Sequence, residues 1–379
     1  MYTVSSISCR NVALSSASIS GSGQNIVYRF GASYNTEKSI LPNAGNRQVG
    51  LNMNTTYEIY KNLHLNVTAN YVFDKSNGRS NLSDGNGNTN ASLLYRGNSF
   101  NIDWMKGTAA GWGTNLDGSE MIGGTNVYFN NPYWLQYRKT NNMERNRLTG
   151  QVQLRWDITN WLYLQGAVQR DGYSIEYKQV QPIGAAADPK GWLTEYEKNF
   201  HESNYNFLLG FNKEFGKLSV GATFGGNKQY NETKQFTVSD GGRPFVVDGL
   251  WSVNNLTDKR PAKSDVRYQV NSFYGTVDLG WANQVFLNLT ARNDWFSTLS
   301  KDSNSYFYPS ATLSWVFTDT FRNSLPEWFE FGKLRAGLAA ASNGTSAYQN
   351  LLLYQLRNYT INGVQVATQN NGNKYPNAN

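Results

Sequence analysis

The sequence predicts an all-β protein: an antiparallel transmembrane β-barrel fragment in which an open sheet of about 12 strands forms part of the wall. Three observations support this prediction. Apolar and polar residues alternate with period two, the links between the expected strands are alternately short and long, and aromatic residues gather beside the short links.

The composition excludes several other classes. Of 379 residues, 39% are hydrophobic, 16% are charged and 14% are aromatic, with 24 Tyr and 11 Trp. A soluble protein of this composition has little aliphatic material for a core, whereas a wide barrel has a polar lumen and needs only an apolar outer band. No run of about 18 apolar residues is present, which excludes a helical membrane protein.

The alternation is clearest in two segments. In Leu63–Phe73 the odd positions are apolar or aromatic, and His64 and Asn66 are among the polar residues between them. In Leu148–Ile158 the even positions are mostly apolar and the odd ones, such as Gln153, are polar. Such strands fit a half-buried sheet as well as a wall between lipid and water, so alternation alone leaves both open.

The lengths of the links favour the barrel. We expect strands at 12–20, 25–34, 47–57, 63–73, 147–157, 161–171, 202–214, 217–230, 267–280, 284–294, 306–317 and 332–342. The short links are 21–24, 58–62, 158–160, 215–216 and 281–283, and the long ones are 74–146, 172–201, 231–266 and 295–305. Outer-membrane barrels have short periplasmic turns and long extracellular loops. The link 318–331 is longer than the other turns, with a short helical turn expected near Leu325–Phe329.

Aromatic residues flank the short turns, as expected of an interfacial girdle. The alternative is that aromatics simply favour strand ends. The residues concerned are Tyr57, Tyr60, Trp156, Trp161, Phe211, Phe215, Trp281, Trp315 and Phe317.

Neither catalysis nor a cofactor is indicated. The chain has two histidines and one cysteine, Cys9, and it lacks the common nucleophile, phosphate-loop and metalloprotease motifs. Asp117 and Glu120 share one loop, where a solvated loop is favoured over a glycosidase pair. We expect no metal site. The net charge is +7, but Lys and Arg are spread along the chain, so no nucleic-acid partner is expected.

Aromatic residues in the long links are the candidate substrate-binding residues, because flat rings stack on sugar faces and loops carry binding sites. They are Trp104, Trp112, Tyr133, Trp134, Trp192 and Trp251. The alternative is that they form small clusters that keep the loops ordered, and for Tyr133–Trp134 we favour packing of the loop against the lumen. The polar residues expected to face inward are Arg29, Gln151, Gln153, Arg155, Gln165, Gln169, Asn288 and Arg292. Of these, Arg155 and Arg292 are expected equally to form salt bridges, with a plug or within the wall, or to contact the substrate.

Four segments resemble motifs of the SusC/RagA family of TonB-linked outer-membrane proteins of Bacteroidetes. They are Asn131–Trp134 (NPYW), Thr290–Leu299 (TARNDWFSTL) followed by Tyr306–Ser310 (YFYPS), Phe331–Ala336 (FGKLRA) with Asn343–Thr345 and Tyr348, and Tyr375–Asn379 (YPNAN). Phe296 departs from the pattern, since the family often has Ser there, and Ser342 precedes Asn343 where Gly is usual.

The resemblance implies a barrel of about 22 strands with an N-terminal plug. Residues 1–379 would form a partial TonB-dependent receptor barrel domain without the plug and the C-terminal strands. Met1–Arg10 lacks the features of a signal peptide, so we expect the true start to lie upstream. The resemblance also implies a Gram-negative outer-membrane location in contact with lipid, energy from TonB and a SusD-like surface lipoprotein. Its function would be import of a large nutrient, either a glycan or an oligopeptide.

Two other functions stay open at this point. One is a secreted all-β carbohydrate-binding or adhesive protein, in which Leu63, Leu154 and Leu287 would share a closed sandwich core. The other is an outer-membrane hydrolase in a small barrel, which would need a nucleophile, a base and an acid that the sequence does not supply.

Overall fold

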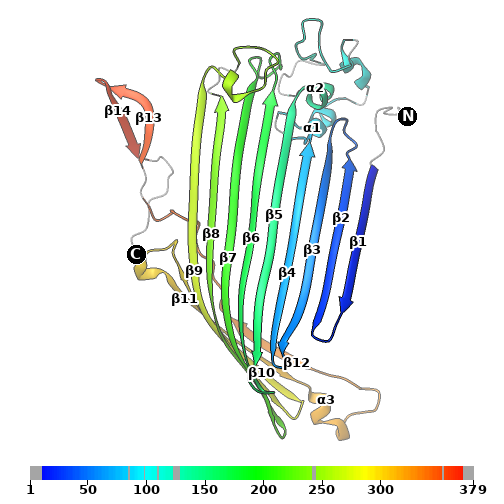
Figure 1. Ribbon diagram of the computed structural model, residues 1–379, viewed down its shortest axis with the longest axis vertical. Helices are drawn as coiled ribbons and strands as arrows, with labels where there is room; N and C mark the ends of the chain where they lie inside the picture. Colours follow the sequence, from blue (N-terminus) through cyan, green and yellow to red (C-terminus); the bar gives the residue numbers. More distant parts are fainter. Residues whose placement is uncertain are drawn as a thin grey trace.

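The computed structural model describes residues 11–83, 86–97, 99–108, 111–122, 129–240, 245–351 and 354–369. Twelve strands form one sheet in which every strand pairs with its neighbours along the chain, always antiparallel (Figure 1). The strands are β1 (Asn11–Ser22), β2 (Ile26–Lys38), β3 (Gly45–Tyr60), β4 (Leu63–Asn77), β5 (Thr140–Asp157), β6 (Leu162–Gln181), β7 (Trp192–Phe215), β8 (Leu218–Asp240), β9 (Lys259–Trp281), β10 (Val285–Phe296), β11 (Ser305–Trp315) and β12 (Leu334–Ala339). A separate hairpin joins β13 (Tyr354–Ile361) to β14 (Val364–Gln369).

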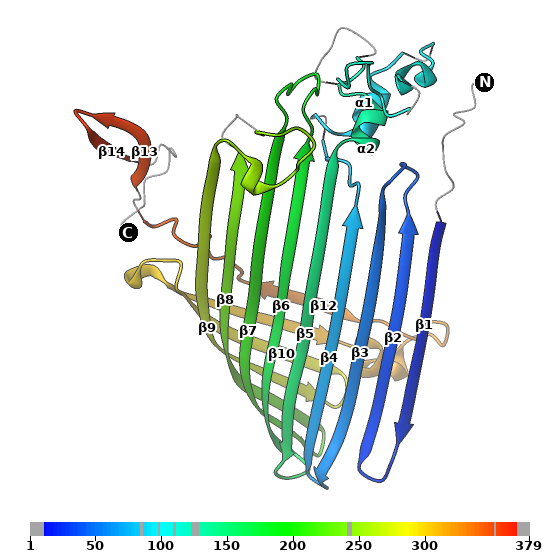
Figure 2. The same ribbon diagram turned by 45° about the horizontal axis from the view of Figure 1, so that its top comes forward.

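The sheet is open and curved: β10 to β12 turn behind the strands that precede them (Figure 2). This confirms the expected all-β wall of next-neighbour strands. Several strands are longer than expected at the end that carries the long loops. The region 172–201, expected to be a loop, is largely strand, because β6 continues to Gln181 and β7 begins at Trp192. At the opposite extreme, β12 is shorter than the expected range 332–342.

The two faces of the sheet differ in polarity. Directly paired residues of an antiparallel sheet point to the same face, and Val67 pairs with Val152, which pairs with Val168. Val152 and Val168 are 50% and 49% exposed on the convex outer face. The outer side chain of Leu154 is likewise 43% exposed. The closed sandwich expected of a secreted binding protein is therefore wrong, because this apolar face is not a shared core.

The aromatic girdle follows the outer face beside the short turns. Tyr57, Trp156, Trp281 and Trp315 all pair with aliphatic outer residues, and the first three are 42%, 46% and 56% exposed. The β9–β10 turn is tight: Ala282 and Asn283 adopt left-handed φ values of 51° and 59°. Exposed aromatic rings at one edge are typical of the boundary between lipid and water.

The long link between β4 and β5 folds into a cap over one end of the sheet (Figure 1). It contains α1 (Thr89–Leu94), η1 (Ile102–Lys106) and α2 (Pro132–Tyr137). The sequence explains the start of α2, because the Asn131 side chain accepts the Tyr133 N–H and Pro132 has no N–H to leave unpaired. Short helical turns occur elsewhere as η2 (Val253–Asn255), η3 (Lys301–Ser303), α3 (Phe317–Thr320) and η4 (Arg322–Ser324).

Within the described ranges, no helix has the length and apolar character needed to cross a membrane.

Candidate functional site

The concave inner face of the sheet is a wall of side-chain amides. Gln169 donates to Gln151 at 2.8 Å, and Gln151 donates to Gln153 at the same distance. On the next strands, Asn227 donates to Asn204 at 3.2 Å. Amides both donate and accept hydrogen bonds, so this wall can bind water or a polar solute without a charge preference. The strand register places all the residues expected to face inward on this side: Arg29, Gln151, Gln153, Arg155, Gln165, Gln169, Asn288 and Arg292.

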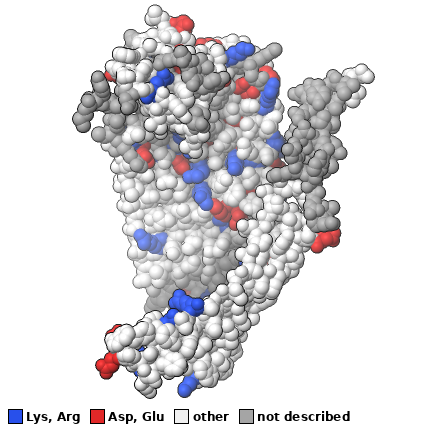
Figure 3. Space-filling view, turned by 180° about the vertical axis from the view of Figure 1, so that it is seen from behind, with Lys and Arg blue, Asp and Glu red and all other residues white. Residues whose placement is uncertain are grey.

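Charged residues on the inner face form ion pairs within the wall. Arg155 contacts Asp157 at 2.9 Å, and Arg292 contacts Asp294 at 2.7 Å. His64, at 3.3 Å from Asp157, belongs to the same group. Arg155 and Arg292 therefore form wall salt bridges. Figure 3 shows charged side chains of both signs along the hollow of the sheet, whereas the near outer surface is almost free of them.

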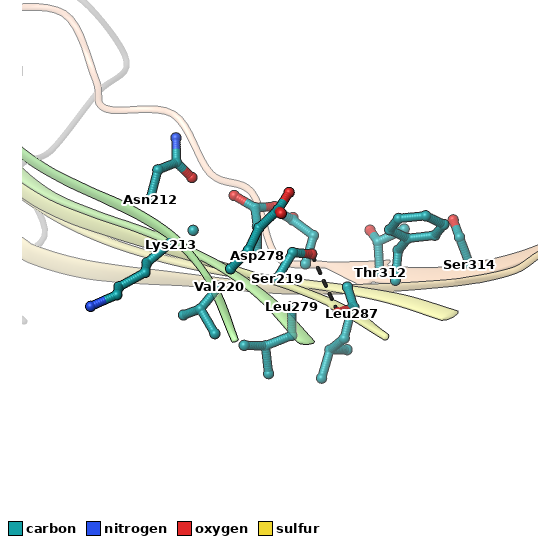
Figure 4. Close-up of a pocket in the computed structure, with 14 residues that line it drawn as sticks. Asn212, Lys213, Ser219, Val220, Asp278, Leu279, Leu287, Thr312 and Ser314 are labelled. Atoms are coloured by element: carbon teal, nitrogen blue, oxygen red, sulfur yellow. Dashed lines mark hydrogen bonds between the residues drawn. The ribbon is translucent and has the colours of Figure 1, made fainter. Parts of the chain in front are cut away.

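A hollow of about 400 Å³ lies on the inner face near the short turns. Figure 4 shows Asn212, Asp278 and Thr312 on one side of the strands, and Val220, Leu279 and Leu287 on the other. Polar side chains meet on the inner side of this hollow, where Asn288 donates to Asp278 at 2.6 Å.

Glu120 joins two loops of the cap. Its side chain is only 3% exposed, and its carboxylate accepts the Ala186 N–H at 2.8 Å, the Asn130 amide at 2.9 Å and the Asn131 N–H. Burial raises the pKa of Glu120, and the hydrogen bonds oppose this shift only in part. The expectation that Glu120 is a solvated loop residue is wrong, whereas Asp117 is exposed and accepts hydrogen bonds from the neighbouring Ser119.

Lys139 precedes β5 beneath the cap. Its ammonium lies 5.5 Å from the centre of the Trp192 ring. Burial lowers the pKa of Lys139 to about 8, against the opposing effect of Asp188. An amine that is partly neutral near physiological pH thus lies between the cap and the first residue of β7.

The four candidate aromatics of the β4–β5 link fall into two pairs. Trp104 and Trp112 are 64% and 43% exposed and free to meet a solute. Tyr133 and Trp134 are buried in α2, where Trp134 packs with Leu135 and with Ala185 of the β6–β7 loop. These two residues therefore pack within the cap, as the cluster alternative predicted, and the contacts of Trp134 are with Leu135 and the β6–β7 loop.

The other two candidates are not placed as expected. Trp192 begins β7 and does not lie in a loop. Trp251 does lie in a loop, but it packs on Phe245 at 4.8 Å and against Val180 and Leu193. Val180 and Leu193 lie on the outer face, because they pair directly with each other at positions where the alternation of β6 and β7 points side chains outward. Trp251 is thus separated from the lumen by the sheet.

The inner face also carries an aromatic ladder that the sequence did not predict. Tyr173 stacks on Phe200 with ring centroids 4.8 Å apart, and Tyr177 stacks on Tyr196 at 4.6 Å. All four are half-buried at the cap end of β6 and β7. The signal was present, because the period-two pattern continues through 172–201. The outward positions there are charged, as in Glu195, so the usual apolar contrast is missing.

No protein-family model matches the sequence. Two curated proteins of Formosa agariphila are similar to it. TonB-dependent receptor P26 is 23% identical over 380 residues, covering 92% of this chain and 34% of that protein. TonB-dependent receptor P3 is 23% identical over 394 residues, covering 98% and 37%. The chain therefore spans about a third of the length of these relatives.

Solved structures share the fold. The RagAB peptide transporter superposes with a TM-score of 0.73 and 14% identity, covering 95% of this chain and 40% of that one. The RagAB peptide importer in its open-open state gives 0.73 and 15%, covering 94% and 39%. The resemblance expected from the motifs is confirmed: the sequence is similar to TonB-dependent receptors over most of its length, and the sheet has the fold of part of the outer-membrane barrel of the RagAB transporter.

Proposed function

We propose that this wall belongs to an importer that carries a large nutrient, a glycan or an oligopeptide, through the outer membrane with energy from TonB. The observation that carries the proposal is the difference in polarity between the two faces of the sheet. The outer face offers aliphatic and aromatic side chains to lipid, and the inner face offers amides and internally paired charges to an aqueous passage. No enzymatic role is part of this proposal.

The cap end is the proposed entry for the substrate. Trp104 and Trp112 extend from the cap as exposed rings. Below them, the ladder of Tyr173, Tyr177, Tyr196 and Phe200 lines the inner wall. Rings at both levels can contact the sugar faces of a glycan or the side chains of a peptide. Tyr133, Trp134, Trp192 and Trp251 then act as supporting residues.

The rest of the machinery is proposed from the relatives. A SusD-like lipoprotein would cover the cap, a plug would fill the lumen and TonB would act on that plug. The solved neighbour RagAB is a peptide transporter. Its activity supports an oligopeptide as one of the two substrate classes proposed for this chain. Residues 1–379 would be one part of the barrel domain.

Uptake in the source bacterium tests the proposal. We would delete the gene, supply labelled oligosaccharides or oligopeptides, and compare uptake with that of the parent and of the complemented strain. A second arm would dissipate the proton-motive force, on which TonB depends. Loss of uptake in the deletion strain for at least one substrate class, together with its loss on uncoupling, is the expected result.

A purification arm tests the partner. The tagged protein, extracted from the outer membrane in mild detergent, should bring a surface lipoprotein with it. Unchanged uptake of every large substrate tested in the deletion strain, combined with a protein that purifies without any lipoprotein, would contradict the proposal and favour an adhesive or binding role.

A further inference from the structure

The link between β11 and β12 differs from the other links at the short-turn end. Those others are tight turns, such as Gly216–Lys217 between β7 and β8. The β11–β12 link runs from Val316 to Lys333 and contains α3 and η4. A turn needs only two to five residues to reverse a hairpin, so the additional residues require another explanation.

Hydrogen bonds hold this link in one shape. The Thr318 hydroxyl is buried, accepts the Gly332 N–H at 3.1 Å and closes the link upon itself. The Trp315 indole donates to Thr320 at 2.9 Å, and Thr320 donates in turn to Gln284 of the neighbouring turn at 3.1 Å. The link is therefore an ordered structure tied to the wall.

Aromatic rings form its interior and much of its surface. Phe317 stacks on Phe329 with centroids 6.0 Å apart, and Trp328 meets Phe329 edge-on at 5.7 Å. Trp328 is nevertheless 79% exposed, and Phe331 and Phe321 are 70% and 46% exposed. Exposed aromatic groups of this size on an ordered element mark a surface that meets a partner or a membrane.

The rings continue the aromatic girdle. Trp315 and Trp281 both pair with Val285, so the three side chains are neighbours on the outer face. Phe321 lies 5.7 Å and Phe317 6.1 Å from the Trp315 ring. The aromatic surface thus extends without interruption from the lipid-facing wall onto the link.

Charged residues limit how deep the link can lie. Asp319 and Arg322 form an ion pair at 3.5 Å, and Glu327 and Glu330 flank the pair Trp328–Phe329 in the sequence. Carboxylates are expensive in the hydrocarbon core but tolerated among headgroups, where tryptophan is also enriched. Aromatic and charged groups on one short element fit the plane of the interface.

We propose that the β11–β12 link, Val316–Lys333, is an interfacial anchor that lies in the headgroup region of the inner leaflet and binds phospholipid through Trp328, Phe321 and Phe331. The anchor fixes the height and tilt of this part of the wall. It serves the barrel whichever substrate passes through, and therefore does not depend on the proposed import function.

Electron paramagnetic resonance of the whole protein in phospholipid nanodiscs tests the anchor. With Cys9→Ser as background, a nitroxide would be attached at Trp328→Cys. The lipid-facing reference would be Leu289→Cys, and the aqueous reference at the same end would be Lys61→Cys in the β3–β4 turn. The measured quantity is the ratio of collision rates with oxygen, which partitions into lipid, and with a water-soluble nickel complex.

We expect the ratio at position 328 to lie between those at positions 61 and 289, above the aqueous reference and below the hydrocarbon one, as a site among headgroups requires. A ratio equal to that at position 61 would overturn the proposal and assign the rings to a periplasmic protein instead. Should the cysteine variant fold poorly, Trp328→Phe provides a second measurement. Brominated lipids should quench less tryptophan fluorescence in this variant than in the parent, and equal quenching would also overturn the anchor.

Discussion

A charge placed on the outer face of β5 should be far more harmful than the same charge one residue away. The outward apolar positions of β5 run from Leu148 to Trp156, about 27 Å along the strand at roughly 3.4 Å per residue, so Val152 lies at their centre. Val152 pairs with Val67 and Val168, and its 50% exposed side chain has no polar partner on this face.

Arginine at the bilayer midplane of a barrel costs about 2–4 kcal/mol. This corresponds to roughly a 30- to 700-fold change in the folding equilibrium. Val152→Arg should therefore lower the folded fraction strongly. The matched control, Gln153→Arg, places the same side chain among Asn66 and Arg155 on the polar inner face, where it should cost much less.

The assay is the folded fraction of each variant in the outer membrane of the producing cell. It would be measured as heat-modifiable migration on gels and as the urea concentration needed for unfolding. The reasoning is refuted if the two variants lose the same amount of folded protein, or if Gln153→Arg loses more. Either result would mean that Val152 does not face lipid.

Four further predictions concern the cap and its surroundings. Glu120→Ala removes the acceptor of three N–H donors, which should destabilise the cap by about 1–3 kcal/mol. Hydrogen exchange of the cap, measured by mass spectrometry, should therefore accelerate roughly 5- to 150-fold. Unchanged exchange would show that Glu120 does not join the loops. Burial raises the pKa of Glu120 in the folded cap. The stability that this shift contributes to the cap is present below the ordinary glutamate pKa and is lost as the pH rises through the raised pKa. Glu120→Gln should abolish this pH dependence. Lys139, whose pKa is lowered to about 8 by burial, should react with amine reagents with a midpoint near that pH; a midpoint at the ordinary lysine value of about 10.4 would contradict its burial. Trp251→Ala should leave the Km for uptake unchanged, because Trp251 packs on the outer face, and a raised Km would place it on the substrate path.

The part of the fold between lipid and water could be predicted from the sequence. In 63–73 and 148–158 one face meets hydrocarbon and the other meets water, so the polarity contrast is large and the period is evident. The short turns and the aromatic residues beside them could be predicted for the same reason, because they mark the boundary between lipid and water. The expected single sheet of about 12 neighbouring strands is what the structure has.

The cap end could not be predicted as well, for a physical reason. Beyond the apolar band both faces of β6 and β7 meet water, and outward positions carry charges such as Lys178 and Glu195, which pair at 2.7 Å. Because the two faces of these strands do not differ in polarity, their sequence resembles that of a loop. It therefore does not indicate the stacked rings of Tyr177 and Tyr196. The burial of Glu120 depends on Ala186, which is distant along the chain, and no local pattern reveals such a contact.

Cysteine scanning of β5 from Leu148 to Asp157 in native outer membranes, with a water-soluble maleimide, tests most directly whether the wall separates lipid from an aqueous lumen. We predict a period of two, in which Gln151 and Gln153 positions react while Val152 and Leu154 positions are protected. Uniform reactivity along the strand, or protection of the glutamine positions with reaction at the aliphatic ones, would contradict the account.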